Sequence, residues 1–586
     1  MRLRLALVLL VLALAGCGRD AAQVGAGPVS APPAPSPAAA EKPAATGPRE
    51  RPLSLSIGYL RRDTQRKRAY ERWRRTELAK ARRSRTVAGA LRRALLARHI
   101  GRAEHDRLRD LYERARADVG RLPGLRGSEL RAVVGSVDAL AASRRLTAGR
   151  FAPVFLTLRR NDEFWRAAPM PAPGQRETFG DDPAVFQYYP GRGMQLQQLA
   201  SWGRVNARLG VCIAPRKREQ RDLIAAMGGG SKGRCAKTAL RRALDRLVAL
   251  GAQRGRFVAW EYYFSFGGGT PPWISGMTQG TAIQALARAT RVFPEGSHRY
   301  RRTAVRALGA FRAPPPVGVR VAAPAGSHYL MYSFSPGLRI LNGDLQAITG
   351  LRDLAVLGRS RAARVLFRRG ERAARGAVGG FDTGAWSLYS QNGRESTLSY
   401  HRLVGTFLGN LCRRTDTSTY CAAHRRFARY EREPPRIRLA QLTRLRAERG
   451  TSLRFTLSKL SSVRVRVSGS RGVSMSREMS VSRGTYTVPW TPPRRGRYRV
   501  LIAAKGPSGP TGVRSETVSV RMSERAAQQL AARRRAAERR AARRRAAERR
   551  AAREEQRPTE RRAVAKVPQA SKRGIAPLRK ESTKRR

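Results

Sequence analysis

The spacing of apolar residues changes its period once along the chain, and this change separates two types of fold. From about 58 to 430, apolar residues recur at helical spacing, as in 281–293 and 361–376. From about 450 to 521 they alternate with polar residues, which is the pattern of half-buried strands. A chain of 586 residues is also long enough for more than one folding unit. We therefore predict a mainly α protein with a small all-β unit near its end.

Composition and period together predict six segments. The helical body alternates helices with Gly-, Pro- and aromatic-rich loops, which fits an α/α-toroid, and its best strand candidate is 256–266. The alternating segment predicts an immunoglobulin-like sandwich. In chain order the segments are a signal peptide (1–16), an Ala/Pro-rich linker (17–52), an N-terminal region of three or four helices (58–147), the toroid domain (148–435), the β-sandwich (450–522) and an Arg/Ala-rich basic helix with a disordered tail (523–586).

The first residues predict export and lipidation. Arg2 and Arg4 precede an apolar run that ends in Leu14-Ala-Gly-Cys17, the pattern of a bacterial lipoprotein signal. The run is far shorter than the about 20 residues that span a bilayer. We expect a mature chain that starts at lipidated Cys17, is anchored to the bacterial cell membrane and acts outside the cytoplasm; a plain secretory signal is the alternative.

Four cysteines remain after Cys17, an even number in a chain expected to be exported. The simplest pairing joins Cys212 to Cys235 and Cys412 to Cys421, although the sequence allows three connectivities and four reduced thiols are the alternative. No Cys/His spacing of a zinc site and no H-E-x-x-H motif occurs, so we predict no metal and no cofactor. A phosphate-binding loop and a nucleophile elbow are also missing from the sequence.

The net charge of +77 comes mostly from arginines spread along the whole chain. Because the chain also lacks a recognised nucleic-acid motif and is expected to be exported, we do not expect nucleic acid as a partner. The basic end of the chain repeats AARRRAAERR, at 531–540 and 541–550, without an apolar seam for a coiled coil. It is either a solvated helix or a contact for anionic cell-wall polymer or lipid headgroups.

Aromatic and polar side chains gather in five loops of the helical body. Aromatic faces with hydrogen-bonding groups between them suit a sugar, which has an apolar ring face and a rim of hydroxyls. Each tyrosine taken singly fits a core position equally well. The loops are 186–193, 260–263, 271–280, 329–332 and 381–389.

These loops resemble the C-terminal domain of the D-glucuronyl C5-epimerases over about 145–430. The resemblance implies an α/α-toroid and the conversion of D-glucuronate to L-iduronate within an acidic, heparosan-type polysaccharide. Removing the C5 proton, which lies α to the carboxylate, requires acid/base groups and a group that neutralises charge. The motifs that match in order and spacing are Tyr332-Ser-Phe-Ser-Pro336, Leu341-Asn-Gly343, Phe381-Asp-Thr-Gly384, Ser387-Leu-Tyr389 and Tyr400-His401, together with the PPWISGMTQG stretch.

By this resemblance the proton chemistry belongs to Tyr332, Tyr389 and Tyr400. We expect Arg192 and Arg394 to hold the uronate carboxylate, with solvated arginine as the alternative for both. Asn342 either positions substrate or caps a helix. The remaining substrate-binding candidates are Tyr188, Tyr189, Gln195, Trp273, Gln279, Tyr329, Asp382 and His401.

One position departs from the family pattern. The family has a catalytic Glu directly before the tyrosine that matches Tyr332, whereas this chain has Met331, which cannot take a proton. Helical patterns also occupy the region where the family has a β-barrel. Two alternatives to an epimerase therefore stay open: a non-catalytic glycan-binding scaffold at the cell surface, and a polysaccharide lyase, in which the same deprotonation leads to elimination. Glu261, Asp344, Asp382 and Glu395 are the candidates for the missing base.

Overall fold

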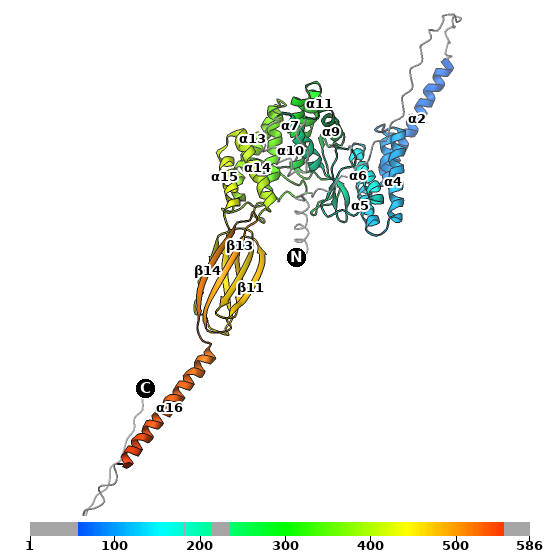
Figure 1. The fold of residues 1–586 in the computed structure, drawn as a ribbon. Coiled ribbons are helices and arrows are strands. Elements are labelled where there is room, and N and C mark those ends of the chain that lie inside the picture. The colour runs from blue at the N-terminus through cyan, green and yellow to red at the C-terminus, as the bar shows by residue number, and fades with distance from the viewer. Residues whose placement is uncertain (1–56, 181, 214–234, 556–586) are drawn as a thin grey trace, which may run out of the picture.

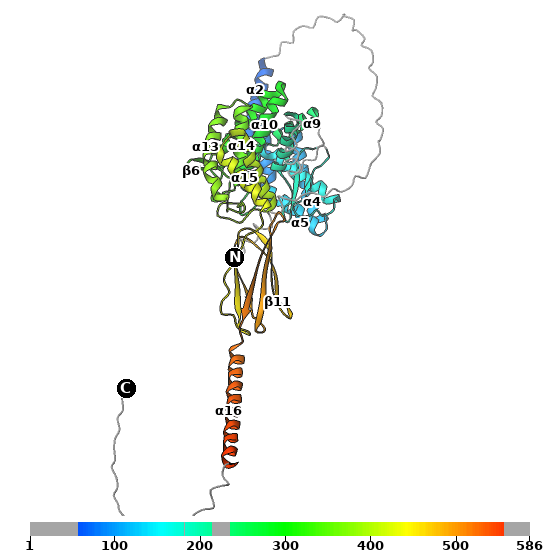
Figure 2. The ribbon, with the colours of Figure 1, turned by 60° about the vertical axis from the view of Figure 1, so that its left-hand side comes forward.

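The computed structural model describes residues 57–180, 182–213 and 235–555. Within these residues a helical body, a β-sandwich and a long C-terminal helix follow one another and give an elongated molecule (Figures 1 and 2). The predicted signal peptide, Cys17 and the Ala/Pro-rich linker lie outside the described residues, as does the tail beyond Glu555. Among the described residues, no helix is both long and apolar enough to cross a bilayer.

Helices occupy the N-terminal part of the described chain. Leu91, Leu108 and Leu130, which come from three of them, are buried in an apolar core that continues into the body as far as Tyr430. The N-terminal helices therefore pack on the body and share its core. They are α2 (Ile57–Arg83), α3 (Val87–Leu96), α4 (Arg102–Arg121), α5 (Gly124–Ala142) and α6 (Ala148–Ala167).

The body is a set of helices packed side by side. Helix α10 lies between α7, α11 and α12, while α12 also contacts α13 and α14, and α14 packs on α15. Hydroxyl side chains start several of these helices, as Ser275 does for α10 and Thr397 for α14. The helices are α7 (Gln198–Ile213), α9 (Lys237–Ala249), α10 (Gly276–Val292), α11 (Ser297–Ala307), α12 (Leu341–Val356), α13 (Arg361–Ala377), α14 (Leu398–Thr415) and α15 (Ser418–Arg432).

Short antiparallel sheets lie between these helices. In the first sheet, β2 pairs with both β1 and β3, and Tyr189 lies opposite Gly193 at the hairpin turn. The strand expected over 256–266 is limited to β5, because the chain beyond it enters an aromatic loop. The strands are β1 (Arg176–Glu177), β2 (Phe186–Tyr189), β3 (Gly193–Leu196), β4 (Ala252–Arg254), β5 (Phe257–Ala259), β6 (Arg320–Ala323) and β7 (Gly326–Tyr329).

Two antiparallel sheets form the β-sandwich, with strand orders β11-β10-β13-β14 and β12-β9-β8. The alternating residues of the sequence face its core: Val463, Val465 and Val467 of β10 are all buried, and Trp490 closes the core from β12. The strands are β8 (Ile437–Leu439), β9 (Thr451–Leu457), β10 (Ser461–Gly469), β11 (Gly472–Val481), β12 (Gly484–Trp490), β13 (Gly496–Lys505) and β14 (Thr511–Val520).

The two local disulfides are formed, Cys212–Cys235 and Cys412–Cys421. The second joins α14 to α15 at the end of the body. Beyond the sandwich, α16 (Glu524–Glu555) extends away from the rest of the described chain (Figure 1), and its residues are exposed along nearly its whole length.

Candidate active site

Three tyrosines that are far apart in the sequence meet on one side of the body. Tyr332 follows β7, Tyr389 precedes α14 and Tyr400 lies in the first turn of α14. The phenol of Tyr389 lies close enough to those of Tyr332 and Tyr400 for both of them to act on its pKa. The rings of Tyr389 and Tyr400 meet edge to face with centroids 4.9 Å apart. The structure thus brings together the three residues expected to carry proton chemistry.

Local hydrogen bonds fix two of the loops that carry these phenols. Tyr389 donates its backbone N–H to the Arg394 carbonyl at 2.9 Å, which closes a small hairpin. Beside Tyr332, Ser333 exchanges hydrogen bonds with Ile274, whose backbone N–H lies 3.1 Å from the Ser333 hydroxyl. The phenols are therefore held by loops that are tied to the body.

The three phenols differ in how their neighbours act on them. Burial raises the pKa of Tyr332, Tyr389 and Tyr400. At Tyr389 the neighbouring phenols Tyr332 and Tyr400 oppose the effect of burial and lower the pKa, because they favour the phenolate. Tyr389 in turn raises the pKa of Tyr332 and of Tyr400 further. Tyr332 and Tyr389 are partly exposed, while Tyr400 is buried. Deprotonation is thus least costly at Tyr389, which makes it the candidate base.

Arg176 of β1 is a positive charge that acts on one of the three phenols, Tyr400, and on the neighbouring Tyr189 and Tyr262. Burial raises the pKa of Tyr189, Tyr262 and Tyr400, and the positive charge of Arg176 lowers it in all three. The Arg176 Nε donates to Gln187 Oε1 of the neighbouring strand at 3.0 Å. Sequence reasoning missed Arg176, because nothing in the sequence distinguishes it among 118 Lys and Arg residues.

A cluster of aromatic rings lies beside the phenols. Trp273 stacks on Tyr262 with ring centroids 4.2 Å apart, and its ring meets that of Tyr332 at 5.8 Å. Tyr189 and Phe264 complete the buried part of this aromatic cluster. The structure therefore joins three of the predicted loops, those at 186–193, 260–263 and 271–280. Flat apolar faces beside hydroxyl groups match the chemistry of a sugar ring.

Gln197 connects the hydroxyls of this cluster. Its Nε2 donates to the Tyr189 hydroxyl at 2.8 Å, and its Oε1 accepts from the Tyr262 hydroxyl at 2.9 Å. Thr278 Oγ1 lies 2.8 Å from the Tyr262 hydroxyl. Because the Tyr189 oxygen accepts from Gln197, its own proton points away from Gln197. Gln197 belongs to no recognised motif, so sequence reasoning missed it.

Several predicted substrate-binding residues have structural partners instead. The Tyr188 hydroxyl donates to Glu129 of α5 at 2.9 Å, and the buried Tyr329 hydroxyl donates to the Leu366 carbonyl at 2.8 Å. Both polar ends of Gln279 bind the backbone of Trp260. The substrate contacts expected of Tyr188, Tyr329 and Gln279 are corrected accordingly, because these polar atoms already have partners within the fold.

His401 and Asp382 are corrected in the same way. The His401 ring stacks on Trp386 at 3.7 Å between centroids, and its nitrogens lie 2.8 Å from the Ser387 hydroxyl and 3.0 Å from the Phe427 carbonyl. Burial lowers the pKa of His401, so its ring is neutral near pH 7. Asp382 accepts from Arg426 at 2.8 Å and from a tyrosine of α15 at 3.0 Å, which fixes its loop to that helix.

Four further candidates lie at the edges of the site. Arg192 occupies the turn between β2 and β3, where its carbonyl accepts from the Gln195 side chain. Asn342 lies in the first turn of α12 with its Oδ1 2.9 Å from the Gly343 N–H, but the N-cap residue of this helix is Ile340 and no side chain caps it, so the capping alternative is wrong. Arg394 is exposed and faces the β-sandwich.

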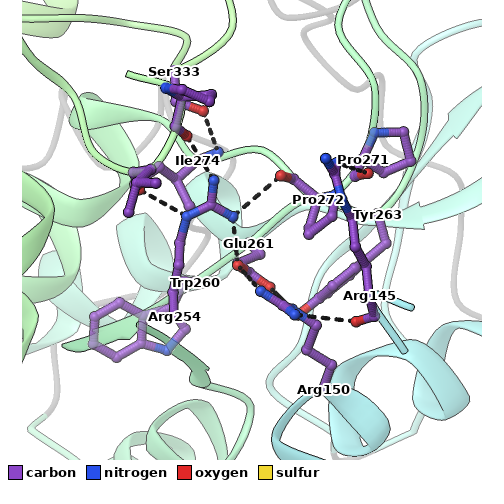
Figure 3. Close-up of polar contacts among 12 residues, drawn as sticks. Arg145, Arg150, Arg254, Trp260, Glu261, Tyr263, Pro271, Pro272, Ile274 and Ser333 are labelled. Atoms are coloured by element: carbon purple, nitrogen blue, oxygen red, sulfur yellow. Dashed lines mark hydrogen bonds and ion pairs between the residues drawn. The ribbon is translucent and has the colours of Figure 1, made fainter. Parts of the chain in front are cut away.

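Glu261 cannot replace the missing family Glu, because two arginines already bind it. Arg150 of α6 donates to Glu261 Oε2 at 2.6 Å, and Arg254 of β4 donates to Oε1 at 2.6 Å (Figure 3). The Tyr263 hydroxyl also donates to this carboxylate, at 3.1 Å. Arg254 further donates to the Pro272 carbonyl, so the cluster fixes the loop that carries Trp273.

The other candidate bases are also engaged. Asp344 accepts from the Tyr329 N–H and lies 3.0 Å from His328, while Glu395 accepts from two backbone N–H groups of the sandwich. Met331 is buried, with its sulfur 3.5 Å from the Ser275 hydroxyl. Glu261, Asp344, Asp382 and Glu395 therefore have partners other than the three phenols, which remain the candidate acid and base groups of this site.

The buried tyrosines predict a loss of stability at alkaline pH. Burial favours the neutral phenol and raises the pKa of Tyr262 to about 12, against about 10 in an unfolded chain. This contribution to stability is complete below pH of about 10 and disappears as the pH rises towards 12. We expect the urea midpoint to fall over this window. The Tyr262→Phe variant is expected to show a shallower fall, and an equal fall would contradict the assignment.

The comparison with known families agrees with this geometry. Residues 254–429 match the family model described as D-glucuronyl C5-epimerase C-terminus. The matched segment runs from β4 to α15 and contains Tyr332, Tyr389 and Tyr400, whereas Arg176 and Gln197 precede it. It covers less than half of the chain, and no curated protein matches the chain. The resemblance drawn from the sequence is thus confirmed over residues 254–429, which match the model of the D-glucuronyl C5-epimerase C-terminus.

Proposed function

We propose that the chain is a C5-epimerase that converts D-glucuronate to L-iduronate within an acidic polysaccharide. The observation that carries this proposal is the group of three neighbouring phenols, Tyr332, Tyr389 and Tyr400, inside the segment that matches the family. The neighbouring aromatic cluster offers a surface for sugar rings. No other group of side chains described above combines proton donors with a surface for a sugar.

In the proposed mechanism, Tyr389 takes the C5 proton as a phenolate, because it is the phenol whose anion is favoured by its neighbours Tyr332 and Tyr400. The electron pair left at C5 is delocalised into the carboxylate as an enediolate, and Arg176 reduces its negative charge. Tyr332 gives its proton to the opposite face of C5. After one turnover Tyr389 is neutral and Tyr332 is ionised, so the reverse reaction uses the same two groups in exchanged roles.

The architecture and location fit the same proposal. We infer that the helices of the body form the α/α-toroid of the family and that the sandwich is immunoglobulin-like. A lipidated Cys17 would hold the protein at the outer face of the cell membrane, where acidic polysaccharide is accessible. The arginines of α16 would bind anionic wall polymer or lipid headgroups.

The test is incubation of the protein with a glucuronate polymer in deuterated water, followed by NMR of C5. An epimerase incorporates deuterium at C5 and yields iduronate. Appearance of ultraviolet absorbance from an unsaturated uronate would instead identify a lyase. Neither exchange nor binding of a glucuronate polymer would overturn the proposal.

A non-catalytic glycan-binding scaffold is the second candidate, and Met331 is the observation that favours it. A glutamate at this position would lie beside Ser275, near the N-terminal ends of α10 and α12, where a negative charge is stabilised. If the wild type binds polymer without exchange, Met331→Glu is expected to create exchange, while Met331→Gln, of similar shape but unable to take a proton, is not. Exchange in the wild type would exclude the scaffold.

A further inference from the structure

A cavity of about 550 Å³ lies where the body meets the β-sandwich. The loop before α14 forms one wall with Thr383, Arg394 and Glu395. The sandwich and the segment that leads into it form the other wall, with Arg436 and Arg483. Pockets of about 300–1,000 Å³ are typical of sites for small molecules and sugar units.

Three exposed arginines give this junction cavity a positive charge. Among the described residues, Arg394, Arg436 and Arg483 form no ion pair with a carboxylate. The acid among the lining residues, Glu395, is buried and accepts from the backbone N–H groups of Leu460 at 3.0 Å and Arg483 at 2.6 Å. Arg436 also donates to the Gly384 carbonyl at 3.3 Å, and the positive charge of Arg483 acts on Glu395. Because each guanidinium has five N–H donors, donors remain for an external anion.

The walls of the junction cavity are fixed to one another. The buried Lys459 of the sandwich donates to the carbonyls of Tyr430 and Glu433, both at 2.6 Å. Ser508 donates to the Glu431 carbonyl at 2.6 Å. A ligand therefore meets a preformed site, and little ordering of the two domains accompanies binding.

One hairpin connects the junction cavity to the phenols. Leu388 pairs with Glu395 as an isolated bridge, and Tyr389 donates its N–H to the Arg394 carbonyl. The first strand of the hairpin thus carries the candidate base, and the second carries two residues of the cavity wall. The candidate base and one wall of the cavity therefore belong to the same hairpin.

We propose that the junction cavity binds the carboxylate of a uronate unit of an acidic polysaccharide, at a position remote from the reacting unit. The three guanidinium groups supply charge-assisted, bidentate hydrogen bonds, and the hydroxyls of Thr383, Ser458 and Ser482 line the same space for sugar hydroxyls. This inference rests on the proposed function in one respect, since it takes the polymer to be the same. Under this proposal the β-sandwich contributes to binding of the polysaccharide.

The test compares binding of heparosan oligosaccharides to two double variants of the full chain, by calorimetry at about 0.15 M salt. Arg436→Gln with Arg483→Gln removes two charges from the junction cavity, while Arg466→Gln with Arg497→Gln removes two exposed charges elsewhere on the sandwich. We expect the dissociation constant of long oligosaccharides to rise by about tenfold or more in the first variant only. A disaccharide, which cannot reach from Tyr389 to the cavity, is expected to lose no exchange rate.

The outcomes separate this inference from the proposed function. Equal affinity of the cavity variant and the wild type, or an equal loss in the control variant, overturns the cavity site. Loss of binding in the cavity variant without any C5 exchange in the wild type supports the cavity site and overturns the epimerase. A matched urea midpoint for the two variants shows that the difference in binding does not come from unfolding.

Discussion

Replacing Tyr389 with phenylalanine is expected to lower the rate of C5 deuterium exchange by about 10²–10⁴-fold, the usual contribution of a positioned acid or base. The ring that meets Tyr400 stays, and the hydroxyl whose pKa is lowered by Tyr332 and Tyr400 is removed. The change therefore acts on proton transfer more than on packing. The measurement is initial exchange at C5 by NMR, with oligosaccharide binding determined in parallel.

The Tyr329→Phe variant is the matched control. It removes one phenolic hydroxyl from a buried ring whose partner is the Leu366 carbonyl, away from the three phenols. It is expected to lower the free energy of unfolding by about 1 kcal/mol and to leave the exchange rate within a few fold. Unchanged exchange in Tyr389→Phe, or an equal loss in Tyr329→Phe, would remove Tyr389 from the reaction.

The sequence predicted the sandwich core well, because alternation is a local signal. Val463, Val465 and Val467 follow each other at every second position, and all three are buried. A strand with one buried face leaves this pattern in any sequence that forms it. The helices of the body could be predicted for the same reason, because helical periodicity is also a local signal.

The site could be predicted only in part, because its parts come from distant segments. The tyrosines were found through motifs shared with a family, because the residues of a motif lie at a fixed spacing in the sequence. Arg176 and Gln197 precede the matched segment and reach the phenols only through the folding of the β1–β3 sheet and the start of α7. Gln279 and His401 have residue types that suit a site, yet their partners lie within the fold.

The predicted role of Glu261 failed for a related reason. A carboxylate in an aromatic loop reads as a candidate base, and its main partner, Arg150, lies 111 residues earlier in the chain. No pattern of neighbouring residues reveals an ion pair of that separation. The consequence is structural: Glu261 joins the N-terminal helices, through α6, to the loops around Trp273.

Glu261→Gln is therefore expected to lower the free energy of unfolding by about 3–5 kcal/mol, the usual cost of breaking a buried ion pair from one side. The Glu261 side chain is fully buried, and only 13% of Arg150 and 11% of Arg254 is exposed, so the variant leaves two positive charges poorly solvated and without their carboxylate. Urea unfolding at pH 7 measures the change.

Glu163→Gln is the control variant that separates the effect of burial from the loss of an ion pair as such. Glu163 also binds an arginine, Arg160 at 2.7 Å, but 44% of its side chain is exposed. Its loss costs at most about 1 kcal/mol, because water solvates Glu163, and Arg160, of which 17% is exposed, keeps a second carboxylate, Asp182, at 3.6 Å. A similar decrease in the free energy of unfolding in both variants would mean that burial does not determine the cost of breaking the ion pair. A large loss in Glu261→Gln alone would establish that this carboxylate holds the N-terminal helices to the aromatic loop, and that it is not available as a base at C5.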